Sequence, residues 1–205
     1  MSRLALRVDP NGSEAAGRVL ARRWEALLAR TPRWMEGCRT VRPDLTAVNL
    51  LLGFFPNAPQ PAANRDGTLL LWLDGEIWDR EAARQRAGVS ARARLTDTEL
   101  CLRLYERHGE AFCERLNGQF VIAVYDTARQ RLLVCNDRHG FRPLFWQQEG
   151  TAFTCATEIK SILAASARTP ALDHAGVLEL LAYGHQLGER TLFQGIHALP
   201  SAAVL

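Results

Sequence analysis

The sequence lacks the features that would assign it to several common protein classes. No apolar stretch approaches the ~20 residues that a membrane-spanning helix needs. The first residues, M-S-R-L-A-L-R-V-D-P-N-G, contain no signal-peptide core followed by a small-residue cleavage site. The five cysteines form no C-x-x-C pair and the five histidines are equally dispersed, which argues against a disulfide scaffold and a metal site. We therefore expect a cytoplasmic protein without a membrane segment or a bound metal.

A dense block of one charge is also absent. The chain has 25 basic and 22 acidic residues, and its net charge is only +3. The arginines are scattered in the pattern of solvated helix and loop faces, so a nucleic-acid partner is not expected. With 47% hydrophobic and 23% charged residues in 205 positions, the composition is that of an ordinary globular protein with one large domain.

Apolar patterning predicts several strands with helices grouped between them. Strands are expected at residues 3–8, 47–55, 68–73, 120–126, 131–137, 144–148 and 152–157, with short strands at the end of the chain. Helices are expected at residues 14–30, 158–165 and 173–183, and after the capping box T-D-T-E at residues 96–99. The first helix should bury Ala16, Leu20, Trp24, Leu27 and Leu28. This order of elements predicts an α+β fold.

Three stretches resemble one protein family. They are L-D-G-E-I-W-D at residues 73–79, T-D-T-E at residues 96–99, and the run from Leu116 to Trp146 with T-E-I-K-S-I-L after it. In this order they resemble the glutaminase half of asparagine synthetase, a class II glutamine amidotransferase domain. The resemblance covers roughly residues 47–205, and we expect residues 1–205 to form one such domain. It implies an Ntn-hydrolase fold, a four-layer αββα sandwich with two antiparallel sheets.

The family's chemistry starts from an N-terminal cysteine that attacks the glutamine side-chain amide, with its own amino group as the base. An asparagine and the glycine after it hold the oxyanion, and an arginine holds the substrate carboxylate. In this chain the nucleophile position holds Ser2, and Arg3 replaces the next glycine. Counting back from the Gln60-Pro61 pair places Asn49 at the arginine position. The resemblance therefore implies a changed nucleophile and a changed carboxylate site.

The family's N-G-E triplet is here Asp74, Gly75 and Glu76. Asp74 stands at the oxyanion position, where an ionised carboxylate donates no hydrogen bond and would repel the developing charge. Losing one oxyanion donor typically costs ~10²–10³-fold in rate. Gly75, Glu76 and Asp97 match the family's pocket for the substrate amino group. Cys38 could be a displaced thiol, but an internal cysteine does not fit a mechanism in which the terminal amine is the base.

The resemblance therefore favours a pseudoenzyme. In the family, this domain feeds ammonia to an ATP-pyrophosphatase synthetase domain with an S-G-G-x-D-S loop, which this sequence does not contain. Relatives without the cysteine, such as β-lactam synthetase and lasso-peptide cyclase, keep the domain as a structural half of a ligase. We expect such a partner domain in cis or in trans, with ATP and Mg bound there and no cofactor in this domain. Homodimer formation, and whether the chain is a fragment or stands alone, stay open.

Two alternatives remain at this stage. One is an active Ntn amidohydrolase, or a glutamine-hydrolysing asparagine synthase domain, with Ser2 as its nucleophile. The other is a non-enzymatic module that binds an amino acid or amine through Gly75, Glu76 and Asp97. Within the long matching run, Asp137 and Gly140 are expected to fix a turn between strands and not to contact a substrate.

Overall fold

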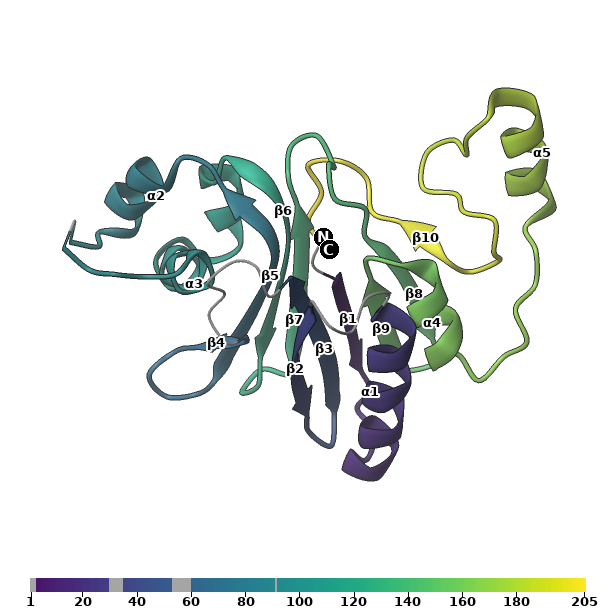
Figure 1. The fold of residues 1–205 in the computed structure, drawn as a ribbon, viewed down its shortest axis with the longest axis horizontal. Helices are drawn as coiled ribbons and strands as arrows, with labels where there is room; N and C mark the ends of the chain where they lie inside the picture. Colours follow the sequence, from purple (N-terminus) through teal and green to yellow (C-terminus); the bar gives the residue numbers. More distant parts are fainter. Residues whose placement is uncertain (1–2, 30–34, 53–59, 91) are drawn as a thin grey trace. The chain divides into compact units, whose positions relative to one another are not determined.

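The computed structural model describes residues 3–29, 35–52, 60–90 and 92–205 (Figure 1). The chain divides into two compact units. Unit 1 consists of residues 3–50 and 143–200, and unit 2 consists of residues 51–142 and 201–205. Within the described ranges, no helix has the length and apolar character needed to cross a membrane.

Unit 1 is built on a six-stranded sheet in the order β10-β8-β9-β1-β3-β2. Its strands are β1 (Arg3–Val8), β2 (Met35–Val41), β3 (Leu45–Leu52), β8 (Phe145–Glu149), β9 (Ala152–Ala156) and β10 (His197–Ala198). Strand β1 lies between β3 and β9 and pairs antiparallel with both. The predicted strand at residues 3–8 is thus confirmed as an inner strand of this sheet.

Helices α1 (Glu14–Leu28) and α4 (Ile159–Ala165) pack against this sheet through one apolar cluster. Both predicted helices are confirmed, but the buried stripe of α1 differs from the prediction: Gly17, Ala21, Trp24 and Leu28 are buried, whereas Leu27 is 36% exposed. A Cβ at Gly17 would lie only 2.6 Å from the hydroxyl of Thr46. The helix approaches the strands closely along its small residues, so side-chain size and not only hydrophobicity selects the buried face.

Unit 2 contains a four-stranded sheet in the order β4-β5-β6-β7. Its elements are β4 (Ala62–Ala63), β5 (Leu69–Ile77), β6 (Gly118–Asp126), β7 (Arg131–Asn136), α2 (Arg80–Ala87), α3 (Asp97–His108) and the 3-10 helix η2 (Gly109–Arg115). Helix α3 and η2 pack with β5, β6 and β7 around one apolar cluster. The C-terminal residues run along β7, where the N–H groups of Val134 and Leu205 each donate to the other's carbonyl at 2.8 Å.

The capping box at the start of α3 is confirmed. The Glu99 N–H donates to the Thr96 hydroxyl at 3.2 Å, and the Thr96 N–H donates to the Glu99 carboxylate at 2.8 Å. The buried residues of this helix are Thr98, Leu100, Cys101, Leu102 and Leu104, whereas Tyr105 is only partly buried.

Removing this cap should weaken the fold measurably. Thr96→Ala is expected to lower the free energy of unfolding by about 1 kcal/mol, because a helix N–H loses its acceptor. Thr96→Ser keeps the hydroxyl and is expected to retain most of the stability. Urea unfolding of both variants followed by tryptophan fluorescence checks this, and equal losses in the two variants would contradict it.

Helix α5 (His174–Tyr183) is also confirmed, with Asp173 as its N-cap. The Gly176 N–H donates a hydrogen bond to the Asp173 carboxyl and is the main cause that lowers its pKa. The positive charge of the nearby Arg190 lowers this pKa further. Arg190 also forms an ion pair with Glu179 of the helix at 3.1 Å. The contacts of this helix are thus mainly with the loop that follows it.

Candidate active site

The sequence-predicted oxyanion residues lie near the end of β5, in a continuous ladder with β6. Asp74 pairs with Val121, Gly75 with Phe120 and Glu76 with Gln119. The alternation of the strand puts Asp74 and Glu76 on one face, but Asp74 is 1% exposed whereas Glu76 is exposed. Asp74 is therefore a carboxylate buried in an apolar strand, an arrangement that requires a compensating charge or hydrogen bonds.

The backbones of β5 and β6 are so close at Gly75 that only a glycine fits at this position. Its φ is +138°, and a Cβ at this position would lie 2.0 Å from the Gln119 carbonyl oxygen and 2.7 Å from the Phe120 Cα. Gly118 is in a similar position, since its Cβ would lie 2.2 Å from the Glu76 carbonyl oxygen. The two glycines let β5 and β6 approach closely on either side of Glu76.

Arg142 supplies the charge that Asp74 needs. Its Nη1 donates to Asp74 Oδ1 at 3.0 Å, and the two side chains are 15% and 2% exposed. Within the described residues the Nε of Arg142 is buried and has no hydrogen-bond partner. From sequence we expected the Asp74 charge to repel an oxyanion; the guanidinium offsets that charge, and the remaining obstacle is that Asp74 donates no hydrogen bond.

The turn before Arg142 holds this arginine in place. Asp137 accepts hydrogen bonds from the N–H groups of Phe120, His139 and Phe141 at 2.9–3.3 Å. Gly140 has a φ of +62°, in the left-handed region that glycine adopts without strain. Asp137 and Gly140 thus fix a turn between strands, as predicted, and the turn delivers Arg142 to Asp74.

Asp97, predicted to receive a substrate amino group, is already engaged. Its Oδ2 accepts the Ile77 N–H at 3.3 Å. Its Oδ1 lies 2.8 Å from Arg80 Nη1, as an ion pair without hydrogen-bond geometry. The contact with Ile77 brings Asp97 beside the β5 end that carries Gly75 and Glu76, so these three predicted residues do come together.

Of the other two predicted positions, one belongs to unit 1 and one lies outside the described residues. Asn49 is on β3 in unit 1, completely buried, and both polar atoms of its amide lack a hydrogen-bond partner among the described residues. An uncharged amide at this position offers no charge to a substrate carboxylate. Ser2, the predicted nucleophile, lies outside the described residues.

Sequence reasoning missed Arg142 and Arg80, the two arginines that bind the predicted site carboxylates. One signal was present: an aspartate inside the apolar run L-L-L-W-L-D implies a buried partner of opposite charge. Which of the many arginines supplies that charge depends on contacts across 68 positions of sequence. Among the described residues, no group of three His, Cys, Asp or Glu side chains could hold a metal ion.

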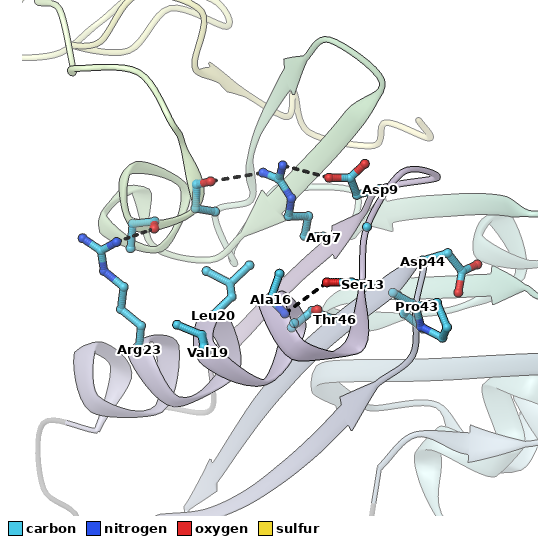
Figure 2. A pocket seen from close by; sticks show the side chains of 15 residues that line it. Arg7, Asp9, Ser13, Ala16, Val19, Leu20, Arg23, Pro43, Asp44 and Thr46 are labelled. Atoms are coloured by element: carbon cyan, nitrogen blue, oxygen red, sulfur yellow. Dashed lines mark hydrogen bonds and ion pairs between the residues drawn. The ribbon is translucent and has the colours of Figure 1, made fainter.

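A cavity of about 400 Å³ lies in unit 1, and none of the site residues named above is among those that line it (Figure 2). Two arginines line it, and both donate to carbonyls at the C-terminal end of α4: Arg7 to Ala165 at 3.2 Å and Arg23 to Ala164 at 3.0 Å. Cations are stabilising at a helix C-terminus, where the last carbonyls lack partners within the helix. We read this cavity as part of the packing between α1 and α4, and not as the active site.

One family model and several known proteins match this chain in sequence. A model of the glutamine amidotransferase domain matches residues 19–205. Asparagine synthetase [glutamine-hydrolyzing] 3 of Bacillus subtilis is 32% identical over 150 residues, which are 72% of this chain and 24% of that protein. The amidase chyE of Penicillium rubens is 30% identical over 139 residues, 67% of this chain and 20% of that protein. The chain thus spans about a quarter or less of the length of these relatives.

A structural comparison gives the fold. The glutamine phosphoribosylpyrophosphate amidotransferase of Bacillus subtilis superposes with a TM-score of 0.59 at 16% identity, over 80% of this chain and 43% of that chain. The predicted α+β class with two antiparallel sheets, in the Ntn amidotransferase fold, is thereby confirmed. Together with the family match over residues 19–205, this means that the chain belongs to the glutamine amidotransferase domain family and is related to asparagine synthetases and fungal amidases.

Proposed function

We propose that this domain no longer hydrolyses glutamine and is the structural half of an ATP-dependent amide-forming enzyme. The observation that carries the proposal is the ion pair of Asp74 with Arg142 at 3.0 Å. Amide hydrolysis needs preorganised donors aimed at the developing oxyanion. At the position where the family has a neutral amide donor, this chain has a carboxylate, and the Nη1 of Arg142 that faces it donates to that carboxylate.

One further substitution and one ion pair support the proposal. The buried Asn49 amide replaces a guanidinium, so the charge that would hold the substrate carboxylate is missing from this position. Asp97 is paired with Arg80 at 2.8 Å, and an incoming substrate amine would have to compete with this arginine. The losses therefore affect the oxyanion site, the carboxylate site and the amine site together.

The relatives support a partner domain. They include a glutamine-hydrolysing asparagine synthetase, and this chain spans 24% of its length. In the proposed role, an ATP-pyrophosphatase synthetase domain, joined in cis or bound in trans, activates a carboxylate with ATP and Mg. The amidotransferase-like domain then contributes folding and docking surface, and the amine comes from a source other than glutamine.

A glutamate-release assay tests this proposal. Purified chain incubated with L-glutamine is expected to release glutamate no faster than the Ser2→Ala variant, because neither has a functional oxyanion site. Intact mass of the same sample establishes whether Met1 has been removed, so that a silent assay cannot be attributed to a blocked N-terminus. Glutamine turnover that Ser2→Ala abolishes would overturn the proposal and assign Ser2 as a working nucleophile.

A further inference from the structure

Two large aromatic side chains of unit 2 are exposed and lie against each other. Trp78 is 54% exposed and Phe141 is 59% exposed. Their ring centroids are 6.3 Å apart and the angle between the ring planes is 54°, so the rings form a corner and not a parallel stack. The ring of Phe141 also lies 5.4 Å from that of His139. We call these three rings the aromatic corner. A contiguous apolar surface that stays exposed is typical of a binding site.

The backbone on both sides of the aromatic corner is held by hydrogen bonds. The Trp78 N–H donates to the Asn117 carbonyl at 2.9 Å, directly beyond the last pair of the ladder between β5 and β6. The N–H groups of His139 and Phe141 donate to Asp137 Oδ1 at 2.9 and 3.3 Å. Rings on a backbone fixed in this way are in place before a ligand arrives, which lowers the entropy cost of binding.

Glu76 of β5 lies between the aromatic corner and the ion pair of Asp74 with Arg142. It is two residues from Trp78 in one direction and two residues from Asp74 in the other, and residues two apart in a strand face the same side. The turn after β7 reaches both of these neighbours, since its phenylalanine contacts Trp78 and its arginine pairs with Asp74. The Glu76 carboxylate is therefore placed beside the rings.

The charge beside the aromatic corner is negative. Glu76 is exposed, and within the described residues its carboxylate has no ion pair or hydrogen-bond partner. The nearby ion pairs of Asp74 and Asp97 carry no net charge. Arg138 of the turn is exposed, but it lines a different cavity together with Glu114. An exposed carboxylate without a counter-charge, next to exposed rings, is complementary to an organic cation.

We propose that the aromatic corner and Glu76 bind the quaternary ammonium group of a free small molecule. Such a cation is attracted to the faces of aromatic rings, and most strongly to tryptophan. It has no N–H group, so it needs no hydrogen-bond acceptors, and one carboxylate suffices to balance its charge. A primary ammonium is strongly hydrated and would need more acceptors than this surface offers. Two exposed rings and one carboxylate provide contacts for a single group of this kind.

This inference goes beyond the proposed function. The amine site that the family motif predicts at Gly75, Glu76 and Asp97 would receive N–H donors, which a quaternary ammonium group lacks. The rings of the aromatic corner belong to none of the predicted oxyanion, carboxylate and amine positions. Binding at the corner requires neither glutamine hydrolysis nor its loss, so the glutamate-release assay and the experiment below can fail independently of each other.

A titration followed by NMR tests the proposal. In a proton–nitrogen spectrum of the full chain, the indole N–H signal of Trp78 is identified by its absence from the Trp78→Phe variant. Choline is the probe, and dimethylbutanol, in which a carbon replaces the charged nitrogen, is the uncharged control of the same shape. We expect choline to shift the Trp78 signal saturably and to bind roughly tenfold more tightly than the alcohol. No response to choline, or equal responses to both compounds, would overturn the proposal.

Three variants separate the contributions of ring and charge. Phe141→Leu keeps an exposed apolar side chain but removes a ring, and should weaken choline binding about two- to fivefold. Glu76→Gln removes only the charge and should weaken binding roughly fivefold. Glu114→Gln removes another exposed carboxylate of unit 2, on η2, and should leave the affinity unchanged. If the two glutamine variants lose affinity equally, Glu76 is not the counter-charge and the proposal fails.

Two further ligands test the class of molecule that binds. L-Glutamine is expected to leave the Trp78 signal unchanged at concentrations at which choline saturates it. A shift by glutamine at equal affinity would assign the corner to an amino-acid pocket and overturn the proposal. Phosphatidylcholine vesicles are expected to leave the chain in the supernatant on sedimentation. Co-sedimentation that free choline reverses would assign the site to a lipid headgroup and contradict binding of a free small molecule.

Discussion

Replacing Arg142 with methionine is expected to lower the free energy of unfolding by about 3 kcal/mol. The variant removes the guanidinium from an ion pair in which Asp74 is 2% exposed, and an inadequately compensated buried charge typically costs ~3–5 kcal/mol. We expect the lower end of that range because Arg142 itself is 15% exposed, so water screens part of the interaction. Urea unfolding followed by tryptophan fluorescence gives the difference.

A control variant at an exposed ion pair shows how much of this loss is due to burial of the charge. The ion pair of Arg129 with Asp126 spans 3.4 Å, but its arginine is 78% exposed, so Arg129→Met should cost less than about 1 kcal/mol. In the double variant Arg142→Met, Asp74→Asn, the buried charge is gone, and part of the lost stability should return. If Arg142→Met costs no more than Arg129→Met, the pair is not the buried contact described above.

Replacing Gly75 with alanine is expected to cost more than about 4 kcal/mol or to prevent cooperative folding, a loss that few single substitutions cause. A Cβ there would lie 2.0 Å from the Gln119 carbonyl oxygen, and the ladder between β5 and β6 would have to open to admit it. Because those atoms belong to the backbone of the next strand, no side-chain rotation relieves the contact.

Gly67 provides the comparison for this substitution. Its φ is +68°, but among the described residues, its two chain neighbours aside, no atom lies within 4 Å of the position that a Cβ would take. Gly67→Ala should therefore cost only the roughly 1–2 kcal/mol of the left-handed conformation. Denaturant midpoints of the two alanine variants measure the difference, and equal losses would mean that β6 does not press against Gly75.

The sequence predicted those elements of the fold that are determined by a pattern of neighbouring residues. Dense apolar runs identified β6 and β7, and the T-D-T-E box identified the start of α3 because its hydrogen bonds join residues only three positions apart. Four elements were missed: the strands β2 and β4 and the helices α2 and η2. Two of them show why. Strand β2 (Met35–Val41) carries few large apolar residues, and α2 (Arg80–Ala87) buries only Ala83, so neither presents a clear hydrophobic period.

The same distinction holds for the candidate site, where local motifs could be recognised but contacts between distant residues could not. Family motifs located Asp74, Gly75, Glu76 and Asp97, and the structure brings the last three together beside β5. What sequence could not supply was the partner of each carboxylate. Arg142 is 68 positions from Asp74, and only the turn built on Asp137 fixes where its side chain reaches.

The central claim, that the site no longer attacks a glutamine amide, can be tested in a single turnover. A glutamine analogue with an electrophilic diazoketone in place of the side-chain amide alkylates the N-terminal nucleophile of a working site, and intact mass then reports one adduct. We expect no adduct on the chain freed of Met1, because the oxyanion position holds a carboxylate and the carboxylate position holds an uncharged amide. A stoichiometric adduct that maps to Ser2 and disappears in Ser2→Ala would contradict this account.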